Sequence, residues 1–175
     1  MFMSRLVIIR GNSGSGKSTI AAKLHGMVDG SVLIEQDYYI KYMSADKEQD
    51  ALRKQRIFDD VKRALDQGNT VILEGVFDSR RYKDYFDDLI SYHPGNTILT
   101  YLDVPFGETL RRHQQRAKKD QFGETEMRGW YIAHDSLGYE GEVVLDETCS
   151  LVDALASIVM RSGLGEQTSL LSLGR

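Results

Sequence analysis

Apolar residues gather in five short continuous runs along the chain instead of alternating with polar residues. The runs cover residues 6–9, 32–34, 71–73, 98–102 and 143–145, and they are rich in β-branched side chains. A continuous apolar run of this length is typical of a strand that is buried on both faces, as in a parallel sheet covered by helices. The pattern therefore predicts five buried parallel strands.

Longer amphipathic stretches lie between these runs and after the last of them. They cover residues 18–28, 47–67, 80–92, 106–118 and 151–160, and each has the spacing of a helix with one apolar face. Pro105 favours a helix start at the next residue, and Ser150 or Thr148 can cap the last helix. Strands that alternate with helices predict an α/β fold with a parallel sheet and right-handed crossovers.

A glycine-rich motif lies between the first predicted strand and the first predicted helix. Residues 11–18 fit the pattern G-x-x-x-x-G-K-[ST] at every position. A strand before the motif and a helix after it are the context of a phosphate-binding loop (P-loop). Glycines let consecutive backbone N–H groups turn onto a phosphate, and the helix N-terminus adds partial positive charge. The motif predicts a nucleoside triphosphate as ligand.

The chemistry of each loop residue predicts its role. We expect Lys17 to reach the β- and γ-phosphates, and we expect the Ser18 hydroxyl to bind Mg²⁺, which prefers hard oxygen ligands. Thr19 is expected on the α-phosphate side. The predicted nucleotide-binding residues are Gly11, Asn12, Ser13, Gly14, Ser15, Gly16, Lys17, Ser18, Thr19 and Arg112.

Carboxylates follow three of the predicted strands, at the edge of the sheet where ligands bind in open α/β folds. Asp37 is the predicted general base, which receives the proton of the acceptor hydroxyl during in-line transfer, and Glu74 is the alternative base. Glu74 is also a predicted Mg²⁺ ligand together with Ser18, unless it anchors a neighbouring loop. Asp103 comes shortly before Pro105 and is expected to cap the following helix.

Basic residues gather after the fourth predicted strand, at Arg111, Arg112, Arg116, Lys118 and Lys119. Arg112 and Arg116 are four residues apart and are expected to share a helix face. They precede a polar segment at about residues 117–128, which is expected to form a short lid. Because arginine donates to phosphate oxygens in a fork, we expect Arg112, Arg116 or Arg128 to stabilise the transferring group. The other interpretation is a solvated basic helix face.

Length and composition bound the class of protein. The length of 175 residues predicts one domain at residues 1–162 and a tail at 163–175. The chain has 22 basic and 26 acidic residues and a net charge of −4. The single Cys149 excludes an internal disulfide and a multi-cysteine metal site. The chain has no apolar run of the ~18 residues that a membrane span needs and no signal-peptide pattern, so we expect a cytoplasmic protein with no membrane partner. The acidic charge argues against a nucleic-acid partner.

These features together resemble the P-loop small-molecule kinases of the uridine-kinase-like, gluconate-kinase-like, chloramphenicol-phosphotransferase and zeta-toxin group. The resemblance covers about residues 4–160 and rests on the glycine-rich motif, the strand ends at 35–39, 73–75 and 101–105, and the arginine-rich segment. It implies a three-layer P-loop NTPase fold with five parallel strands in the order 2-3-1-4-5. It also implies that Asp37 accepts a proton, that Arg112 and Arg116 contact ATP, and that residues 148–151 border the base.

The expected activity is Mg²⁺-assisted transfer of the ATP γ-phosphate to a hydroxyl of a small molecule, such as a nucleoside, a sugar or an antibiotic-like compound. Lys17, Asp37, Arg112 and Arg116 are the predicted catalytic residues. A P-loop ATPase or nucleotide-binding regulatory protein, and a kinase of nucleic-acid 5′ ends, are the alternatives. Both a monomer and a homodimer are compatible with the sequence.

The acceptor side is expected between the second and third strands and just after the third. Aromatic and charged residues gather there, namely Tyr38, Tyr39, Tyr42, Asp50, Arg53, Phe77, Asp78, Arg80, Arg81 and Tyr82. Rings with a few charges suit a ring-containing acceptor. Arg53 or Arg80 is expected either to hold an acceptor phosphate or to pair with Asp59 or Asp84.

Overall fold

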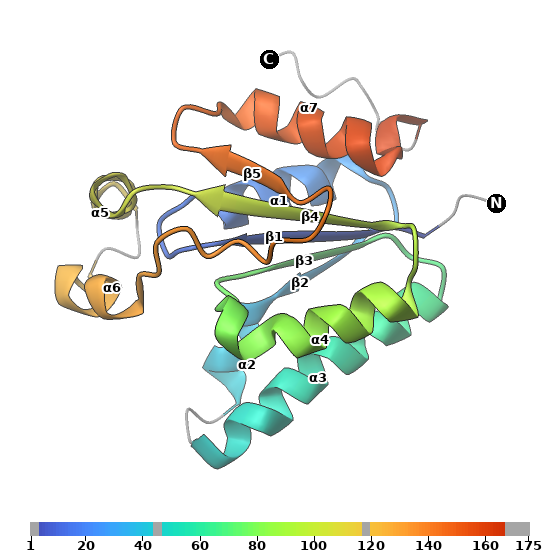
Figure 1. Ribbon diagram of the computed structural model, residues 1–175, viewed down its shortest axis with the longest axis horizontal. Helices are drawn as coiled ribbons and strands as arrows, with labels where there is room; N and C mark the ends of the chain where they lie inside the picture. The colour runs from blue at the N-terminus through green and yellow to red at the C-terminus, as the bar shows by residue number, and fades with distance from the viewer. Residues whose placement is uncertain (1–3, 44–46, 117–119, 167–175) are drawn as a thin grey trace.

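The computed structural model describes residues 4–43, 47–116 and 120–166. Its strands are β1 (Leu6–Gly11), β2 (Val32–Glu35), β3 (Val71–Gly75), β4 (Thr97–Asp103) and β5 (Val143–Asp146). They form one parallel sheet in the order β2-β3-β1-β4-β5 (Figure 1). Each predicted apolar run lies in one of these strands, so the predicted parallel sheet and its strand order are confirmed.

Helices cover both faces of the sheet. They are α1 (Lys17–Met27), α2 (Gln36–Tyr42), α3 (Lys47–Asp66), α4 (Ser79–Tyr92), α5 (Phe106–Gln114), α6 (Glu124–Trp130) and α7 (Leu151–Ser162), followed by a 3-10 turn at Leu164–Glu166. One face carries α1 and α7 and the other carries α3 and α4, while α2, α5 and α6 lie toward the carboxyl ends of the strands (Figure 1). The three-layer α/β architecture is confirmed.

Strand β1 lies at the centre of the sheet and is buried along its whole length. Leu6 and Ile8 join the hydrophobic core under α3 and α4, whereas Val7 and Ile9 join the core under α1 and α7. Successive side chains of a strand point to opposite faces, so a strand buried on both faces needs a continuous apolar run. Because all five strands are parallel, their carboxyl ends meet at one edge.

Helix α2 begins where the sequence pattern indicated only a polar strand end. It has seven residues, with Asp37 in its first turn and Lys41 in its last turn, where each charge complements the helix dipole. A helix this short gains little from its own hydrogen bonds. The tertiary contacts of Gln36, its first residue, hold it in place, as described below.

Helix α5 ends earlier than predicted, at Gln114 instead of residue 118. His113 is buried, and its ring stacks on Phe122 with the centroids 4.4 Å apart, while its Nε2 lies 2.9 Å from the Phe122 carbonyl oxygen. This contact turns the chain back on itself before a further helical turn can form. Arg116 therefore lies beyond the helix, and the prediction that Arg112 and Arg116 share a helix face is wrong.

The predicted lid at about residues 117–128 contains the first part of helix α6, which the sequence pattern did not indicate, while its residues 117–119 lie outside the described residues. In the predicted tail, Leu164 is buried in the core under α1 and α7, and residues 167–175 lie outside the described residues.

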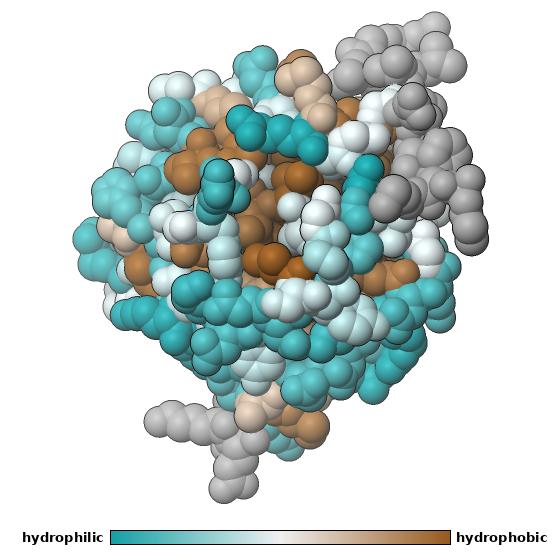
Figure 2. Space-filling view, turned by 45° about the vertical axis from the view of Figure 1, so that its right-hand side comes forward, coloured by the Kyte–Doolittle hydropathy of each residue, from teal (hydrophilic) through white to brown (hydrophobic). Residues whose placement is uncertain are grey.

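Figure 2 shows a largely hydrophilic surface with apolar side chains gathered in a hollow near its centre. None of the helices in the described part of the chain is both long and apolar enough to cross a membrane.

Candidate active site

The glycine-rich loop curls between the end of β1 and the start of α1. Gly16 is the N-cap of α1 at φ 109°, and Gly14 has φ 87°. A Cβ atom added at Gly14 would lie 2.4 Å from the carbonyl oxygen of Thr109 in α5. Side-chain-bearing residues rarely adopt such φ values, and a helix carbonyl cannot retreat, so both positions require glycine. The loop thus packs directly against α5.

The foot of the loop brings three predicted residues together. Lys17 opens α1 and is 7% exposed. Ser18 follows it and donates from Oγ to Oε1 of Glu74 at 3.2 Å. Glu74 comes from the carboxyl end of β3, the strand beside β1, and is 2% exposed. Parallel pairing of β1 with β3 is what places this carboxylate beside the loop.

Glu74 has the surroundings of a cation ligand. Burial raises its pKa, the charge of Lys17 lowers it, and the carboxylate of Asp37 raises it further. The second carboxylate oxygen, Oε2, has no hydrogen-bond partner among the described residues. A buried, unpartnered carboxylate oxygen is costly unless a cation or donor meets it.

Mg²⁺ is the cation that this arrangement fits. It takes hard oxygen ligands and is held in such sites by one or two protein groups plus phosphate oxygens and water. The oxygens of Ser18 and Glu74 match that requirement. The described residues contain no group of three or more His, Cys, Asp or Glu side chains placed to hold a metal.

Asp37 lies in the first turn of α2, exposed to solvent, and close enough to Glu74 to raise its pKa. Its backbone is fixed by Gln36, whose Oε1 accepts from the Val76 backbone at 2.9 Å and whose Nε2 donates to the Tyr82 hydroxyl at 3.0 Å. Gln36 has room because residue 75 is glycine: a Cβ there would lie 2.6 Å from that of Gln36. Sequence patterns do not single out Gln36, because its partners are about forty positions away in the chain.

Arg112 connects three elements around the loop. Its Nη1 donates to the Ser15 carbonyl oxygen at 2.8 Å, its Nη2 donates to that of Glu147 at 3.1 Å, and its Nε pairs with Glu108 at 2.6 Å. It lines a cavity of about 230 Å³ with Ser15, Gly16, Thr19, Ile20, Leu102, Val104, Leu145, Asp146, Cys149, Ser150, Leu151 and Ala154. Apolar walls with a few polar groups at the rim suit a flat aromatic ring.

The other candidate arginines lie apart from Arg112. The Arg116 backbone N–H donates to the His113 carbonyl in the turn after α5, and no side-chain hydrogen bond of Arg116 is found among the described residues. Arg128 lies on α6, where it pairs with Glu124 at 2.6 Å and its guanidinium sits 4.4 Å from the centre of the Phe106 ring. The structure thus brings Arg112 alone of the three into contact with the phosphate loop.

The Asn12 side chain bonds to the chain segment that follows α6. Its Nδ2 donates to the Ile132 carbonyl oxygen at 2.8 Å, and its Oδ1 accepts from the Ile132 backbone N–H at 3.0 Å. The backbone carbonyl of Asn12 accepts from Ser15 at 3.1 Å, which closes the turn of the loop. Asn12 therefore fastens the segment after α6 to the phosphate loop.

The prediction that Asp103 caps the following helix is wrong. The N-cap of α5 is Pro105, with no side-chain capping bond, and Asp103 Oδ2 instead lies 2.7 Å from Nδ1 of His134. His134 has φ 51°, which is unusual for a residue with a side chain. Of the two residues proposed to cap α7, Ser150 does so, accepting from the Asp153 backbone N–H at 3.1 Å.

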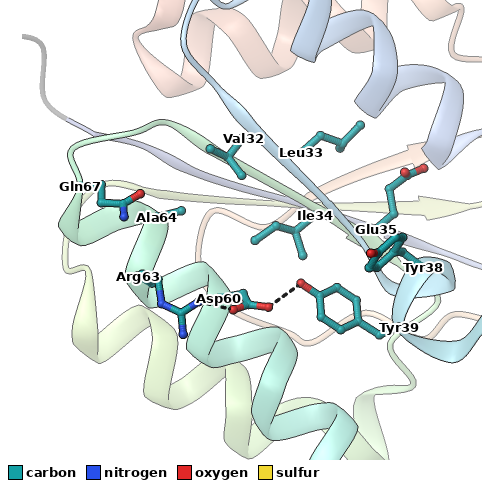
Figure 3. Close-up of a pocket in the computed structure, with 10 residues that line it drawn as sticks. All are labelled: Val32, Leu33, Ile34, Glu35, Tyr38, Tyr39, Asp60, Arg63, Ala64 and Gln67. Carbon is teal, nitrogen blue, oxygen red and sulfur yellow. Dashed lines mark hydrogen bonds and ion pairs between the residues drawn. The ribbon is translucent and has the colours of Figure 1, made fainter. Parts of the chain in front are cut away.

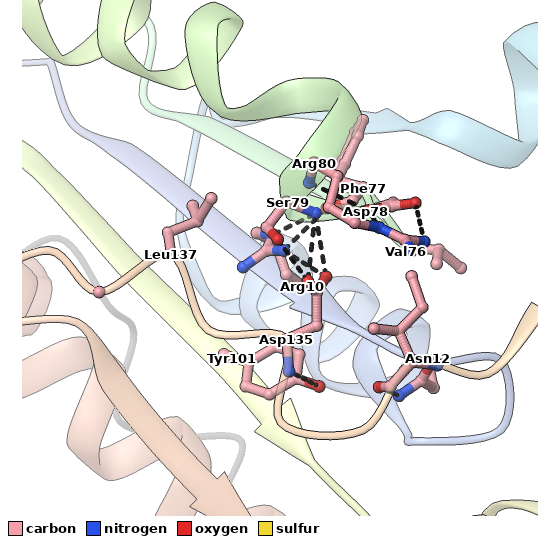
Figure 4. Close-up of polar contacts among 12 residues, drawn as sticks. Arg10, Asn12, Val76, Phe77, Asp78, Ser79, Arg80, Tyr101, Asp135 and Leu137 are labelled. Atoms are coloured by element: carbon pink, nitrogen blue, oxygen red, sulfur yellow. Dashed lines mark hydrogen bonds and ion pairs between the residues drawn. The ribbon is translucent and has the colours of Figure 1, made fainter.

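A fully buried arginine at the end of β1 is a feature that sequence patterns missed. Two nitrogens of Arg10 donate to the Phe77 carbonyl oxygen at 3.1 and 2.8 Å, and Nη2 pairs with Asp135 at 2.9 Å (Figure 4). Asp135 also accepts from the Ser79 hydroxyl at 2.5 Å. On the far side, Nη1 of Arg10 lies 3.5 Å from Glu142. This cluster joins the segment after α6 to the start of α4.

The acceptor-side arginines have partners other than those predicted. Arg53 pairs with Asp50 at 2.6 Å instead of Asp59, and Arg80 pairs with Asp78 at 2.7 Å instead of Asp84. Asp78 is the N-cap of α4 and accepts from the Arg80 backbone N–H, so the first turn of its own helix holds this carboxylate in place.

A second cavity, of about 360 Å³, opens at the outer edge of β2 (Figure 3). Its lining includes the β2 residues together with Tyr38, Tyr39, Asp60, Arg63, Ala64 and Gln67. The Tyr39 hydroxyl donates to Asp60 at 2.9 Å, and Arg63 pairs with the same carboxylate at 2.8 Å. The cavity shares no lining residue with the phosphate loop.

Solved structures of other proteins, kinases among them, have the same fold. A gluconokinase from Sinorhizobium meliloti 1021 superposes with a TM-score of 0.67 at 18% identity, covering 93% of this chain and 96% of that chain. The tunicamycin resistance protein of Deinococcus radiodurans gives 0.66 at 18%, covering 91% and 96%. An APS kinase from Mycobacterium tuberculosis, in complex with AMPPNP and APS, gives 0.66 at 16%, covering 91% and 97%. The chain therefore shares its fold with these three proteins.

The family follows from the sequence. A family model described as an AAA domain (AAA_33) matches residues 6–130. This chain belongs to that AAA-domain family. No curated protein sequence matches it.

Proposed function

We propose that this chain is an ATP-dependent phosphotransferase that moves the γ-phosphoryl group of ATP to a hydroxyl of a small-molecule acceptor. The observation that carries the proposal is the meeting of Lys17, Ser18 and Glu74 at the foot of the phosphate loop, with Asp37 beside them. The first three form a nucleotide site, and Asp37 is a carboxylate within electrostatic reach of it on the side from which an acceptor would approach.

Nucleotide binding uses groups from several elements around the phosphate loop. Backbone N–H groups of the glycine-rich loop surround the phosphates, and the Lys17 ammonium pairs with the β- and γ-phosphates. The base occupies the cavity beside Arg112, between the end of β4 and the start of α7. Arg112 holds the Ser15 carbonyl and thereby keeps this cavity next to the loop.

Ser18 and Glu74 are the residues that would hold Mg²⁺. When bound, the ion neutralises charge on the phosphate oxygens. Ser18 presents its hydroxyl oxygen, and Glu74 presents the carboxylate oxygen that meets no hydrogen-bond donor within the described part of the chain.

The transfer step needs a proton acceptor and a stabilised leaving group. Asp37 accepts the proton of the acceptor hydroxyl, and the hydroxyl oxygen forms a bond to the γ-phosphorus as the bond to the β–γ bridging oxygen breaks and ADP leaves. Lys17 stabilises the negative charge on the transferring group throughout. Arg116, in the turn after α5, is proposed to donate to the same oxygens from the lid side.

The test is a panel of hydroxyl acceptors, comprising nucleosides, sugars and antibiotic-like compounds, each assayed for the release of ADP from ATP. We expect at least one acceptor to accelerate ADP release above hydrolysis by water, and Lys17→Ala to abolish the acceleration while the fold survives. Lys23→Ala, which removes an exposed lysine of the same helix, is the control. ADP release that no acceptor accelerates would favour an ATPase over a kinase.

A further inference from the structure

Three cations share one carboxylate at the N-terminal ends of α3 and α4. Asp50 Oδ1 lies 2.6 Å from Nη2 of Arg53, and Asp50 Oδ2 lies 3.0 Å from Nζ of Lys54 and 2.7 Å from Nη2 of Arg81. We call these four residues the Asp50 cluster. Lys54 and Arg81 thus divide a single carboxylate oxygen between them, in addition to the contact that Arg53 makes.

Among the described residues, Asp50 is the acid that forms ion pairs with Lys54 and Arg81. Burial opposes ionisation of Asp50, but hydrogen bonds from Lys54 and Arg81 outweigh it and lower the pKa of Asp50 to about 2, so it supplies one negative charge at any ordinary pH. At the start of α4, Asp78 pairs with Arg80 at 2.7 Å. Counting only Lys54 and Arg81 against Asp50, a positive charge is left over.

The cluster is a partly enclosed one. The side chain of Arg53 is 11% exposed and that of Lys54 is 12% exposed, whereas that of Arg81 is 54% exposed. Lys54 also lies 4.9 Å from the centre of the Tyr82 ring. Surplus positive charge in such a place is costly unless an anion meets it. Guanidinium and ammonium groups arranged around a shallow site are the groups that bind oxyanions best.

The cluster lies on the acceptor side of the proposed transfer site. Tyr82 separates it from Gln36, and the Tyr82 hydroxyl accepts from Gln36 Nε2 at 3.0 Å. Gln36 in turn precedes Asp37 on α2. Contacts therefore run from Lys54 through Tyr82 to Gln36, the residue that precedes the proposed general base Asp37.

We infer, on the basis of the proposed phosphotransferase function, that the acceptor carries an oxyanionic group (phosphate, sulfate or carboxylate) that Arg53, Lys54 and Arg81 bind. Acceptor selection then depends on two separate groups of the substrate: the hydroxyl that receives the phosphoryl group and an anion at the far end. A neutral sugar or nucleoside satisfies only the first of these.

The first experiment measures anion binding without an acceptor. Inorganic phosphate is titrated into the protein saturated with MgADP, so that the phosphate loop is occupied, and binding is followed through the arginine side-chain N–H resonances. We expect saturable binding that Arg81→Gln and Lys54→Gln each weaken by about 10- to 100-fold. Arg63→Gln is the matched control, because Arg63 lies on the same helix, is 58% exposed and pairs with Asp60 at 2.8 Å; it leaves binding unchanged.

The same titration is repeated in Lys17→Ala without nucleotide. This arm separates the two proposals. If the wild type does not bind MgADP, that result counts against the phosphotransferase, and phosphate binding to the anion site is still measured in Lys17→Ala. Absence of saturable phosphate binding, or equal binding in Arg81→Gln and wild type, overturns the anion site.

The second experiment uses matched acceptors that differ only in a phosphate, sulfate or carboxylate group. We expect the charged member of a pair to have the higher kcat/KM, and Arg81→Gln to remove about 10- to 100-fold of that advantage while the neutral member is unaffected. The arm with the greatest advantage identifies the oxyanion. Equal kcat/KM values within every pair would contradict the inference.

Discussion

Asn12 and Ile132 form a two-point hydrogen bond, with the side-chain amide of one matched to both backbone groups of the other at 2.8 and 3.0 Å. Asn12 belongs to the phosphate loop, and Ile132 belongs to the segment that follows α6. The pairing fixes the position of that segment relative to the nucleotide site, even though the two residues are 120 positions apart.

Asn12→Ala removes both bonds and leaves the Ile132 backbone groups without their partner. We expect unfolding free energy to fall by about 1–3 kcal/mol and the KM for ATP to rise, because the loop loses its brace. Chemical denaturation and ATP kinetics measure the two effects. Asn69→Ala, which removes a side-chain bond to the Ala64 carbonyl remote from the loop, is the control. An unchanged KM for ATP would show that the brace serves stability alone.

Asp135→Ala leaves the buried guanidinium of Arg10 without its closest carboxylate. Burial lowers the pKa of Arg10 and Asp135 raises it, so the pair depends on this contact to keep the arginine charged. We expect a loss of about 3–5 kcal/mol in unfolding free energy, as for other broken buried ion pairs. Asp88→Ala, which breaks the exposed pair with Lys62, is the control and costs no more than about 1 kcal/mol. Equal losses for the two variants would contradict a structural role for the Arg10 cluster.

The parts of the fold that the sequence predicts are those written in local patterns. Continuous apolar runs identify the five strands, and glycine spacing identifies the phosphate loop. Helices α2 and α6 escaped prediction because each has seven residues and is held by tertiary contacts rather than by its own periodicity.

The residues of the candidate site likewise divide into those that a local pattern predicts and those whose roles depend on distant partners. Lys17 and Ser18 follow from the motif, whereas the role of Arg10 depends on Asp135, 125 positions away. Asp103 was misassigned because a carboxylate shortly before a helix fits a local capping rule, while its partner His134 comes from a segment that the sequence does not place nearby.

Glu74→Gln tests the cost of a buried carboxylate at the proposed magnesium site. Burial raises the pKa of Glu74 in the folded protein, so the folded state holds this proton more tightly than the unfolded chain. Without metal or nucleotide, the contribution of Glu74 to the unfolding free energy should therefore fall as the pH rises above about 4.3, the pKa of an unperturbed glutamate. Glu74→Gln abolishes that fall, so the variant gains stability relative to wild type toward neutral pH.

The same variant should lose function as it gains stability. Replacing a charged oxygen by an amide should weaken Mg²⁺-dependent ATP binding by about 10- to 100-fold. Urea denaturation over a pH series and calorimetric titration of ATP with and without Mg²⁺ measure the two effects. Parallel pH–stability curves for variant and wild type would show that the carboxylate pKa does not limit stability.

Asp37→Asn separates nucleotide binding from phosphoryl transfer. The substitution keeps the shape of the side chain and leaves Gln36, the anchor of α2, in place, so we expect unchanged ATP binding. Transfer to the best acceptor in the panel should fall by about 10²- to 10⁴-fold, the range for loss of a general base. Glu35→Gln is the matched control, because Glu35 is also an exposed carboxylate at the end of β2 and also raises the pKa of Glu74. If Asp37→Asn retains transfer and Glu74→Gln loses it with ATP binding intact, the base is Glu74.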